Sequence, residues 1–236
     1  MIRHIAASFS RAAHCAARFI LAGCFVLGLS GACMAAAGAE INSRLLEAAA
    51  RGDAAQISAL LSEGADIETR DGSGRTALLL ATQGDHVDVA RRLIAAGADV
   101  NARDSISDTP YLYAGAEGRN EILKMTLAAG ADLASTNRYG GTALIPAAHH
   151  GHPETVKILL GTAIDINHVN RLGWTALIEA VILSDGGPVH TEIVRLLVEA
   201  GADVNIADRD GVTPLAHARR RGYAQMVAML EKVGAK

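Results

Sequence analysis

The chain has 236 residues, of which 20% are charged, and a formal net charge of −3. A chain of this length holds one or two ordinary domains. The weakly acidic balance argues against nucleic-acid binding, because that function needs a basic face.

The N-terminal segment, residues 1–39, differs from the rest of the chain. It contains arginines and no acidic residue, and from Phe19 to Ala39 it carries no charge while its residues change from large and apolar to small. A basic start, an apolar stretch and a small-residue exit are typical of a secretory signal peptide. A-x-A patterns predict cleavage near 37–39, so we expect export to the periplasm and no membrane contact afterwards.

Two alternatives remain open for this leader. The uncharged run is just long enough for an uncleaved membrane anchor, and LAGC at 21–24 resembles a bacterial lipoprotein box. All three cysteines lie in the leader, so a cleaved chain has no thiol for disulfides, catalysis or metal binding. Cleavage would also remove three arginines and no acid, which changes the net charge from −3 to −6.

The sequence after the leader is repetitive. Two markers, a Thr-Ala or Thr-Pro pair and an aspartate, recur at spacings of 33, 33, 33 and 38 residues. The threonines are Thr76, Thr109, Thr142, Thr175 and Thr213, and the aspartates are Asp66, Asp99, Asp132, Asp165 and Asp203. Two markers that keep one register indicate a repeat architecture.

Each unit contains the signals of two helices and a hairpin. The threonine is expected to cap a first helix that often begins with proline, and a turn glycine such as Gly151 ends it. A second helix with an apolar stripe follows, for example at 156–160. An extended stretch then leads to a hairpin glycine such as Gly140, two residues before the next threonine. The pattern predicts helix-turn-helix units joined by β-hairpin loops.

Two stretches connect these units to a known family. The sequences TPLAHA at 213–218 and GADVN at 97–101 and 201–205 resemble the core and the ending of the ankyrin repeat. The resemblance covers about residues 41 to 234 and implies an all-α repeat fold, the ankyrin solenoid. It implies a capping unit at 41–70, then repeats at 71–103, 104–136, 137–169, 170–207 and 208–236, the last of which caps the C-terminus. We call these the first to fifth repeats; the fourth has five extra residues within 183–190.

The chain departs from the family pattern at several positions. Non-polar residues replace the motif histidine three residues after the threonine: Leu79, Leu112, Ile145, Ile178 and Ala216. Ala163 stands where other units have a helix-ending glycine, and Asp85 occupies a turn-glycine position. A left-handed backbone at a residue other than glycine costs about 1 kcal/mol.

Three histidines lie close together in the sequence PAAHHGHP at 146–153. In the repeat register, His149 and His150 end a first helix, and His152 begins the second helix. Neighbouring helical residues point about 100° apart, whereas zinc-binding helices present ligands one turn apart on one face. We therefore predict no metal site and no cofactor here.

Metal or small-ligand capture remains an alternative at this turn edge. It would need the inserted loop of the fourth repeat, where Asp185 and His190 could approach the histidines. Catalysis has less support, since the chain has no G-x-S-x-G elbow and no Gly-rich phosphate loop after a strand. We expect no enzymatic activity.

The resemblance implies that a partner protein binds in a groove formed by hairpin tips and first helices. Aromatic residues and arginine are favoured at the centres of interfaces. Tyr139 and Trp174 lie beside hairpin glycines, with Arg138 and Arg171 at equivalent tip positions. We predict that these four residues contact the partner. The alternative is that the aromatics pack on adjacent hairpins and stiffen the array.

Four further residues are weaker candidates for this groove: Tyr113, His149, His150 and Glu179. Tyr111 replaces a motif leucine, so it is expected in the core. The overall hypothesis is a monomeric, non-catalytic protein-protein interaction module that acts in the periplasm as scaffold, inhibitor or helper of a partner. A membrane-tethered scaffold with an uncleaved leader is the further alternative.

Overall fold

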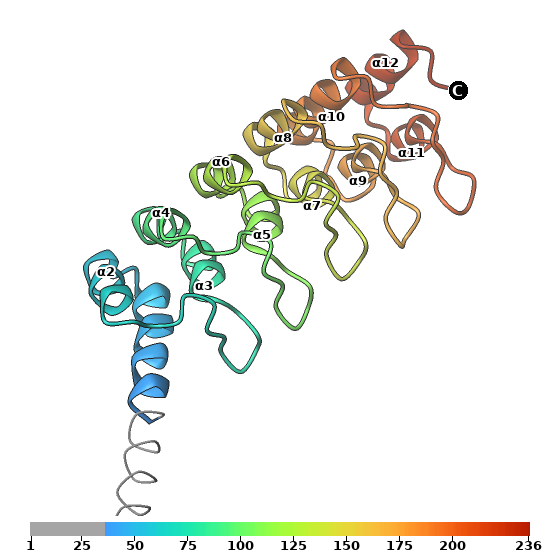
Figure 1. The fold of residues 1–236 in the computed structure, drawn as a ribbon. Helices are drawn as coiled ribbons and strands as arrows, with labels where there is room; N and C mark the ends of the chain where they lie inside the picture. The colour runs from blue at the N-terminus through green and yellow to red at the C-terminus, as the bar shows by residue number, and fades with distance from the viewer. Residues whose placement is uncertain (1–35) are drawn as a thin grey trace, which may run out of the picture.

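The computed structural model describes residues 36–236, so most of the expected signal peptide lies outside the described residues. These residues form a curved stack of helix pairs (Figure 1). The first pair is a helix at 36–51 and α2 (Ala54–Ser62). The following pairs are α3 (Ala77–Gln83) with α4 (Val87–Ala95), α5 (Pro110–Ala116) with α6 (Asn120–Ala128), α7 (Leu144–His149) with α8 (Pro153–Leu160), α9 (Ala176–Ile182) with α10 (Pro188–Glu199), and α11 (Pro214–Arg221) with α12 (Ala224–Lys232).

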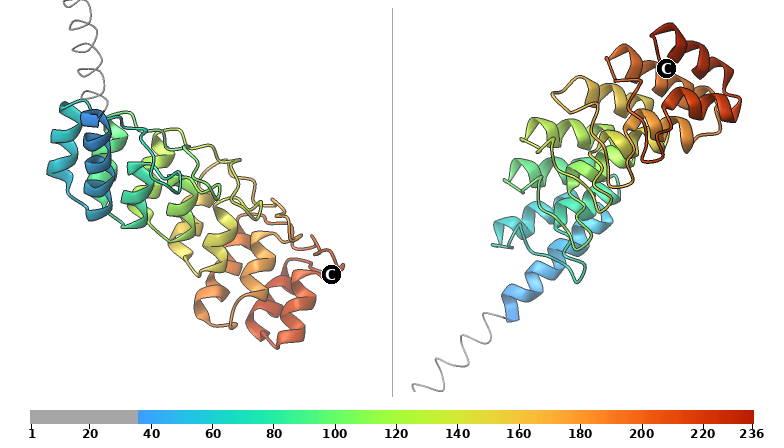
Figure 2. Two further views of the ribbon diagram at one scale, coloured as in Figure 1. Left: turned by 90° about the horizontal axis from the view of Figure 1, so that it is seen from below. Right: turned by 90° about the vertical axis from the view of Figure 1, so that its right-hand side faces the viewer.

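The helices form two rows. The first helices α3, α5, α7, α9 and α11 lie next to the hairpin loops, and the second helices lie behind them (Figures 1 and 2). Neighbours within a row pack together, as α7 does with α5 and α9. One continuous hydrophobic core runs from Leu45 to Leu230. The predicted all-α ankyrin solenoid is therefore confirmed. No helix within 36–236 is both long and apolar enough to cross a membrane.

The capping threonines begin most of the first helices as predicted. The side-chain oxygens of Thr76, Thr109, Thr175 and Thr213 each accept a hydrogen bond from the backbone N–H three residues later. A cap of this kind satisfies a donor that the first turn leaves unpaired and contributes about 1 kcal/mol.

The third repeat is an exception to this rule, and there the expectation was wrong. Helix α7 has Ala143 as its N-cap and no side-chain cap, while the buried Thr142 hydroxyl has no hydrogen-bond partner among the described residues. The reason is Pro146, which has no N–H to donate to the Thr142 carbonyl. The Ile145 N–H donates to that carbonyl at 3.2 Å instead of to the hydroxyl. In the fourth repeat the equivalent N–H, that of Glu179, bonds the Thr175 carbonyl at 3.0 Å.

The hairpins are tight loops closed by one side chain each. The first residue of each loop is Asp or Asn, and its side-chain oxygen accepts backbone N–H groups two and four residues later. These residues are Asp71, Asp104, Asn137, Asn170 and Asp208. Neighbouring loops also join directly, since Arg171 N–H donates to the Tyr139 carbonyl at 2.9 Å. In the described residues the only ladder pairing is an isolated bridge between Arg70 and Thr76.

The chain resolves its departures from the glycine pattern in two ways. Asp85 keeps the left-handed conformation with φ of 55°. Ser107 does the same with φ of 70°; it stands two residues before Thr109, at the hairpin-glycine position of the second repeat. Ala163 avoids it: α8 ends early, at Leu160, and the Thr162 hydroxyl bonds the Leu159 carbonyl at 2.6 Å and accepts the Ile164 N–H at 3.2 Å. The backbone strain considered for Ala163 is therefore absent.

Candidate partner-binding groove

The concave side of the stack carries a groove of about 560 Å³, formed by α5, α7, α9 and the adjoining hairpins. Seven of the eight residues predicted to contact a partner line it: Tyr113, Arg138, Tyr139, His149, His150, Trp174 and Glu179. The structure thus brings together residues from the second, third and fourth repeats that lie far apart in the sequence.

The apolar part of the groove comes mainly from hairpin tips. Ile106, Tyr139 and Leu172 precede the left-handed tip residue of three consecutive hairpins and are 46%, 52% and 46% exposed. The equivalent residues of the first and fifth repeats are the polar Ser73 and Asp210. Sequence reasoning found Tyr139 and missed the other two, although their shared register position was a usable signal.

Trp174 lies next to this tip row, at the start of α9. Its side chain is only half-buried, and its backbone N–H donates to Asn170 Oδ1 at 3.0 Å. Leu183, at the end of the same helix, is 41% exposed and lines the groove too. In the fourth repeat, Trp174 and Leu183 therefore present apolar surface to the groove instead of burying it in the core.

The two tip arginines have different surroundings. The Arg138 guanidinium lies 4.9 Å from the centre of the Tyr139 ring, a cation-π contact, and 4.0 Å from Asp108 Oδ2. Burial, together with the nearby Asp104, raises the pKa of the Asp108 carboxyl. Arg171 does not line the groove, because its Nη1 donates to the Arg138 carbonyl at 3.0 Å and so ties one hairpin to the next.

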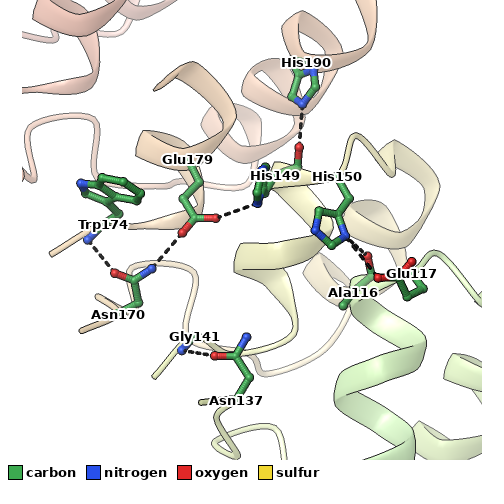
Figure 3. Close-up of polar contacts among 10 residues, drawn as sticks. All are labelled: Ala116, Glu117, Asn137, Gly141, His149, His150, Asn170, Trp174, Glu179 and His190. Atoms are coloured by element: carbon green, nitrogen blue, oxygen red, sulfur yellow. Dashed lines mark hydrogen bonds and ion pairs between the residues drawn. The ribbon is translucent and has the colours of Figure 1, made fainter. Parts of the chain in front are cut away.

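Glu179 is a buried acid at the wall of the groove. The residue is 6% exposed, and its Oε1 accepts a hydrogen bond of 2.8 Å from Asn170 Nδ2. Its Oε2 lies 3.8 Å from His149 Nδ1, which is too far for a hydrogen bond (Figure 3). Burial raises the pKa of Glu179 to about 7, and the bond from Asn170 offsets only part of this effect.

The histidines at the turn edge mainly join repeats. His150 Nδ1 lies 2.7 Å from the Ala116 carbonyl of the preceding repeat, and His190 Nε2 lies 2.9 Å from the His149 carbonyl. Burial lowers the pKa of both His149 and His152. No three His, Cys, Asp or Glu side chains of residues 36–236 are grouped so that they could hold a metal ion. His190, the last residue of the segment with the insertion, thus connects the fourth repeat to the third through a polar contact.

Helix pairs, tight hairpins and a concave groove together define a repeat protein of the interaction type. Family models described as "Ankyrin repeats (3 copies)" match residues 4–104, 45–137 and 112–208, and one described as "Ankyrin repeats (many copies)" matches 190–231. The chain belongs to the ankyrin repeat family, whose members generally serve as non-enzymatic interaction modules.

Solved structures of the same family are closely similar. An ankyrin repeat domain from Acinetobacter baumannii AYE is 56% identical with a TM-score of 0.79, over 81% of this chain and 98% of that one. The ankyrin repeat protein EF0377 is 43% identical with the same TM-score and coverage. The ankyrin repeat domain of Bcl-3, a member of the IκB family, is 29% identical with a TM-score of 0.73, over 82% and 86% of the two chains.

A shorter similarity links the chain to the ankyrin repeat protein YahD of Escherichia coli K12. The two are 44% identical over 57 residues, which make up 24% of this chain and 28% of YahD. The match therefore spans less than a third of that relative.

Proposed function

We propose that this protein is a non-catalytic module that binds a partner protein in the groove of its second to fourth repeats. The observation that carries the proposal is the position of the exposed apolar side chains. Of the seven exposed large hydrophobic residues in the described part of the chain, four line this one groove: Ile106, Tyr139, Leu172 and Leu183.

The physical case rests on what these side chains gain from a partner. Burial of apolar surface contributes about 25 cal/mol per Å², and aromatic anchors in the centre of an interface often account for most of its affinity. The backbone of Tyr139 is held by the hydrogen bond from the Arg171 N–H to its carbonyl, and its ring stacks on Arg138. A preformed surface of this kind loses little conformational entropy when it binds.

The test is capture of the partner by crosslinking in native extract. Wild type is compared with a Tyr139→Ala/Trp174→Ala variant, and a Val169→Ala/Val233→Ala variant removes two exposed apolar residues outside the groove as a control. Circular dichroism establishes that all three are folded. We expect the groove variant to lose the partner, with an affinity at least about 100-fold lower, and the control to retain it. Equal capture by all three would mean that the aromatics only stiffen the hairpins.

We further propose that the protein is exported and acts in the periplasm as a monomeric scaffold, inhibitor or helper of its partner. The basic, then apolar, then small-residue pattern of 1–39 supports export. Cleavage near 37–39 would remove only exposed residues from the start of the helix at 36–51, whose first fully buried side chain is Leu45.

N-terminal sequencing of the protein from fractionated cells tests this second proposal. A chain that begins near Gly38 or Glu40 in the periplasmic fraction is the expected result. An intact Met1 in the membrane fraction would instead indicate a tethered scaffold.

A further inference from the structure

Two polar groups in the groove have no full set of partners within the chain. Glu179 Oε2 has no hydrogen-bond donor within reach among residues 36–236, and the side-chain amide nitrogen of Asn137 donates to no other described residue. Figure 3 shows one oxygen of the Glu179 carboxylate directed toward Asn170 and the other toward His149, with Trp174 on the Asn170 side. Both residues line the groove, and neither atom is sealed from solvent. A ligand that displaces water from Oε2 must therefore supply a donor itself, because a carboxylate oxygen left without one is costly.

The charge of the groove favours a cation. Its lining includes three carboxyl groups, from Asp108, Glu117 and Glu179, and one guanidinium, from Arg138. Arg138 is already occupied, since it lies over Tyr139 and 4.0 Å from Asp108. Glu179 has no basic side chain of the described chain beside it except the imidazole of His149, and burial lowers the pKa of His149.

We propose that the groove recognises a lysine or arginine side chain of the partner protein, held with its charged head on Glu179 and its stem against Trp174. This inference rests on the proposed function and names the partner chemistry for it. The groups that face Glu179 are His149 from α7, Asn170 from the hairpin and Trp174 at the start of α9. None of them is a permanent cation.

The surroundings fit both parts of such a side chain. Lysine and arginine carry a long apolar stem below a charged head, and Trp174 and Leu183 offer apolar surface next to the carboxylate. The charged head would supply the donor that Oε2 lacks, and hydrogen bonds between charged groups are about twice as strong as neutral ones. The free Asn137 amide can donate to a backbone carbonyl of the same segment.

The experiment selects ligands without assuming a sequence. A phage-displayed library of random linear peptides is panned against the purified protein at about pH 8, where Glu179 is ionised. The selected peptides are synthesised, each with a norleucine counterpart in place of its basic residue. Calorimetry then measures their binding to wild type, to Glu179→Gln, to Tyr139→Ala/Trp174→Ala, and to the control Glu154→Gln, whose exposed carboxylate lies on α8 outside the groove.

We expect the selected peptides to share a lysine or arginine among apolar residues. Norleucine should weaken binding to wild type about tenfold or more, and Glu179→Gln should weaken binding of the basic peptide by a similar factor. On Glu179→Gln, basic and norleucine peptides should bind alike, because the two changes remove the same contact. Glu154→Gln should bind as wild type does.

Two kinds of failure can be told apart. Peptides that need Tyr139 and Trp174 but bind Glu179→Gln as well as wild type, or that contain no basic residue, overturn the cation proposal and leave the groove as the binding surface. Peptides that bind all variants equally, or a library that yields no binder, overturn both proposals.

Discussion

The fourth and fifth repeats make the same contact between hairpin and first helix, but the acidic residue lies on opposite sides of it. In both, the first residue of the hairpin loop meets the helix residue nine positions later. In the fifth repeat the hairpin residue is the acid, Asp208, and His217 Nε2 lies 2.7 Å from its Oδ2. In the fourth repeat the acid has moved to the helix as Glu179, and the hairpin residue is the neutral Asn170.

The two acids show that solvent exposure alone does not set a pKa. Both side chains are 8% exposed. Burial tends to raise the pKa of each carboxyl, but hydrogen bonds from Val212, His217 and Asp210 outweigh it and hold the pKa of Asp208 below its ordinary value. Glu179 lies deeper and has one donor, so burial raises its pKa to about 7. Asp208, whose carboxylate accepts several hydrogen bonds, belongs to the last repeat of the stack. Glu179, whose carboxylate accepts one, lines the groove.

The largest expected effect is a gain of stability in Glu179→Gln. The pKa of Glu179 rises from 4.5 to about 7 on folding, so its favourable contribution is complete below about pH 4.5 and is lost as the pH rises through about 7. At about pH 8 the variant should be more stable than wild type by about 3 kcal/mol, and near pH 4.5 the difference should nearly vanish. Urea unfolding at both pH values measures it, and a loss of stability at pH 8 would show that the charge is satisfied internally.

Asp208→Asn should have the opposite sign. A carboxyl with a lowered pKa contributes stability above its unfolded pKa of 3.8, and this contribution is lost as the pH falls through the folded value. At about pH 8 the variant should be less stable by about 1 to 2 kcal/mol, because the bond to His217 loses its charge. The same unfolding series checks this, with Asp210→Asn at the exposed hairpin tip as the control. If Glu179→Gln and Asp208→Asn change the free energy of unfolding in the same direction, the contrast between the fourth and fifth repeats fails.

The third repeat extends the comparison with a smaller effect. Pro146 occupies the position of Glu179 and His217, so the Asn137 amide lacks the side-chain partner of the other two repeats. The Ile145 N–H bonds the Thr142 carbonyl and leaves the Thr142 hydroxyl without a partner. Pro146→Ala should restore the backbone N–H and the threonine cap, and raise the free energy of unfolding by about 0.5 to 1 kcal/mol after the entropic advantage of proline is lost. Pro146→Gln should gain slightly more, since its amide oxygen can accept from Asn137. Thermal unfolding would contradict this account if Pro146→Ala were no more stable than wild type.

Local signals made most of the fold predictable. Capping threonines and turn glycines act within a few residues, so the helix pairs and the position of His149 and His150 at the end of α7 followed from the register alone. The exception at Thr142 arises from a proline four residues away that removes one donor. It could have been inferred from the lack of an N–H in Pro146.

The groove was only partly predictable. Its aromatic members were found because aromatics are rare in this chain, at 3% of all residues. Ile106 and Leu172 were missed because ordinary aliphatic residues attract no notice until the hairpin tips are aligned. The raised pKa of Glu179 could not be predicted from the sequence. Its burial and its single hydrogen bond depend on how the hairpin of Asn170 packs against α9.

Trp174 gives the groove an optical property of its own. It is the single tryptophan of the chain, and its half-exposed indole lies in the groove wall near Glu179. Indole emission depends on the polarity of its surroundings, so any ligand that displaces water from this wall should change the intrinsic fluorescence of the whole protein. The unlabelled molecule is therefore a spectroscopic sensor of its own binding surface.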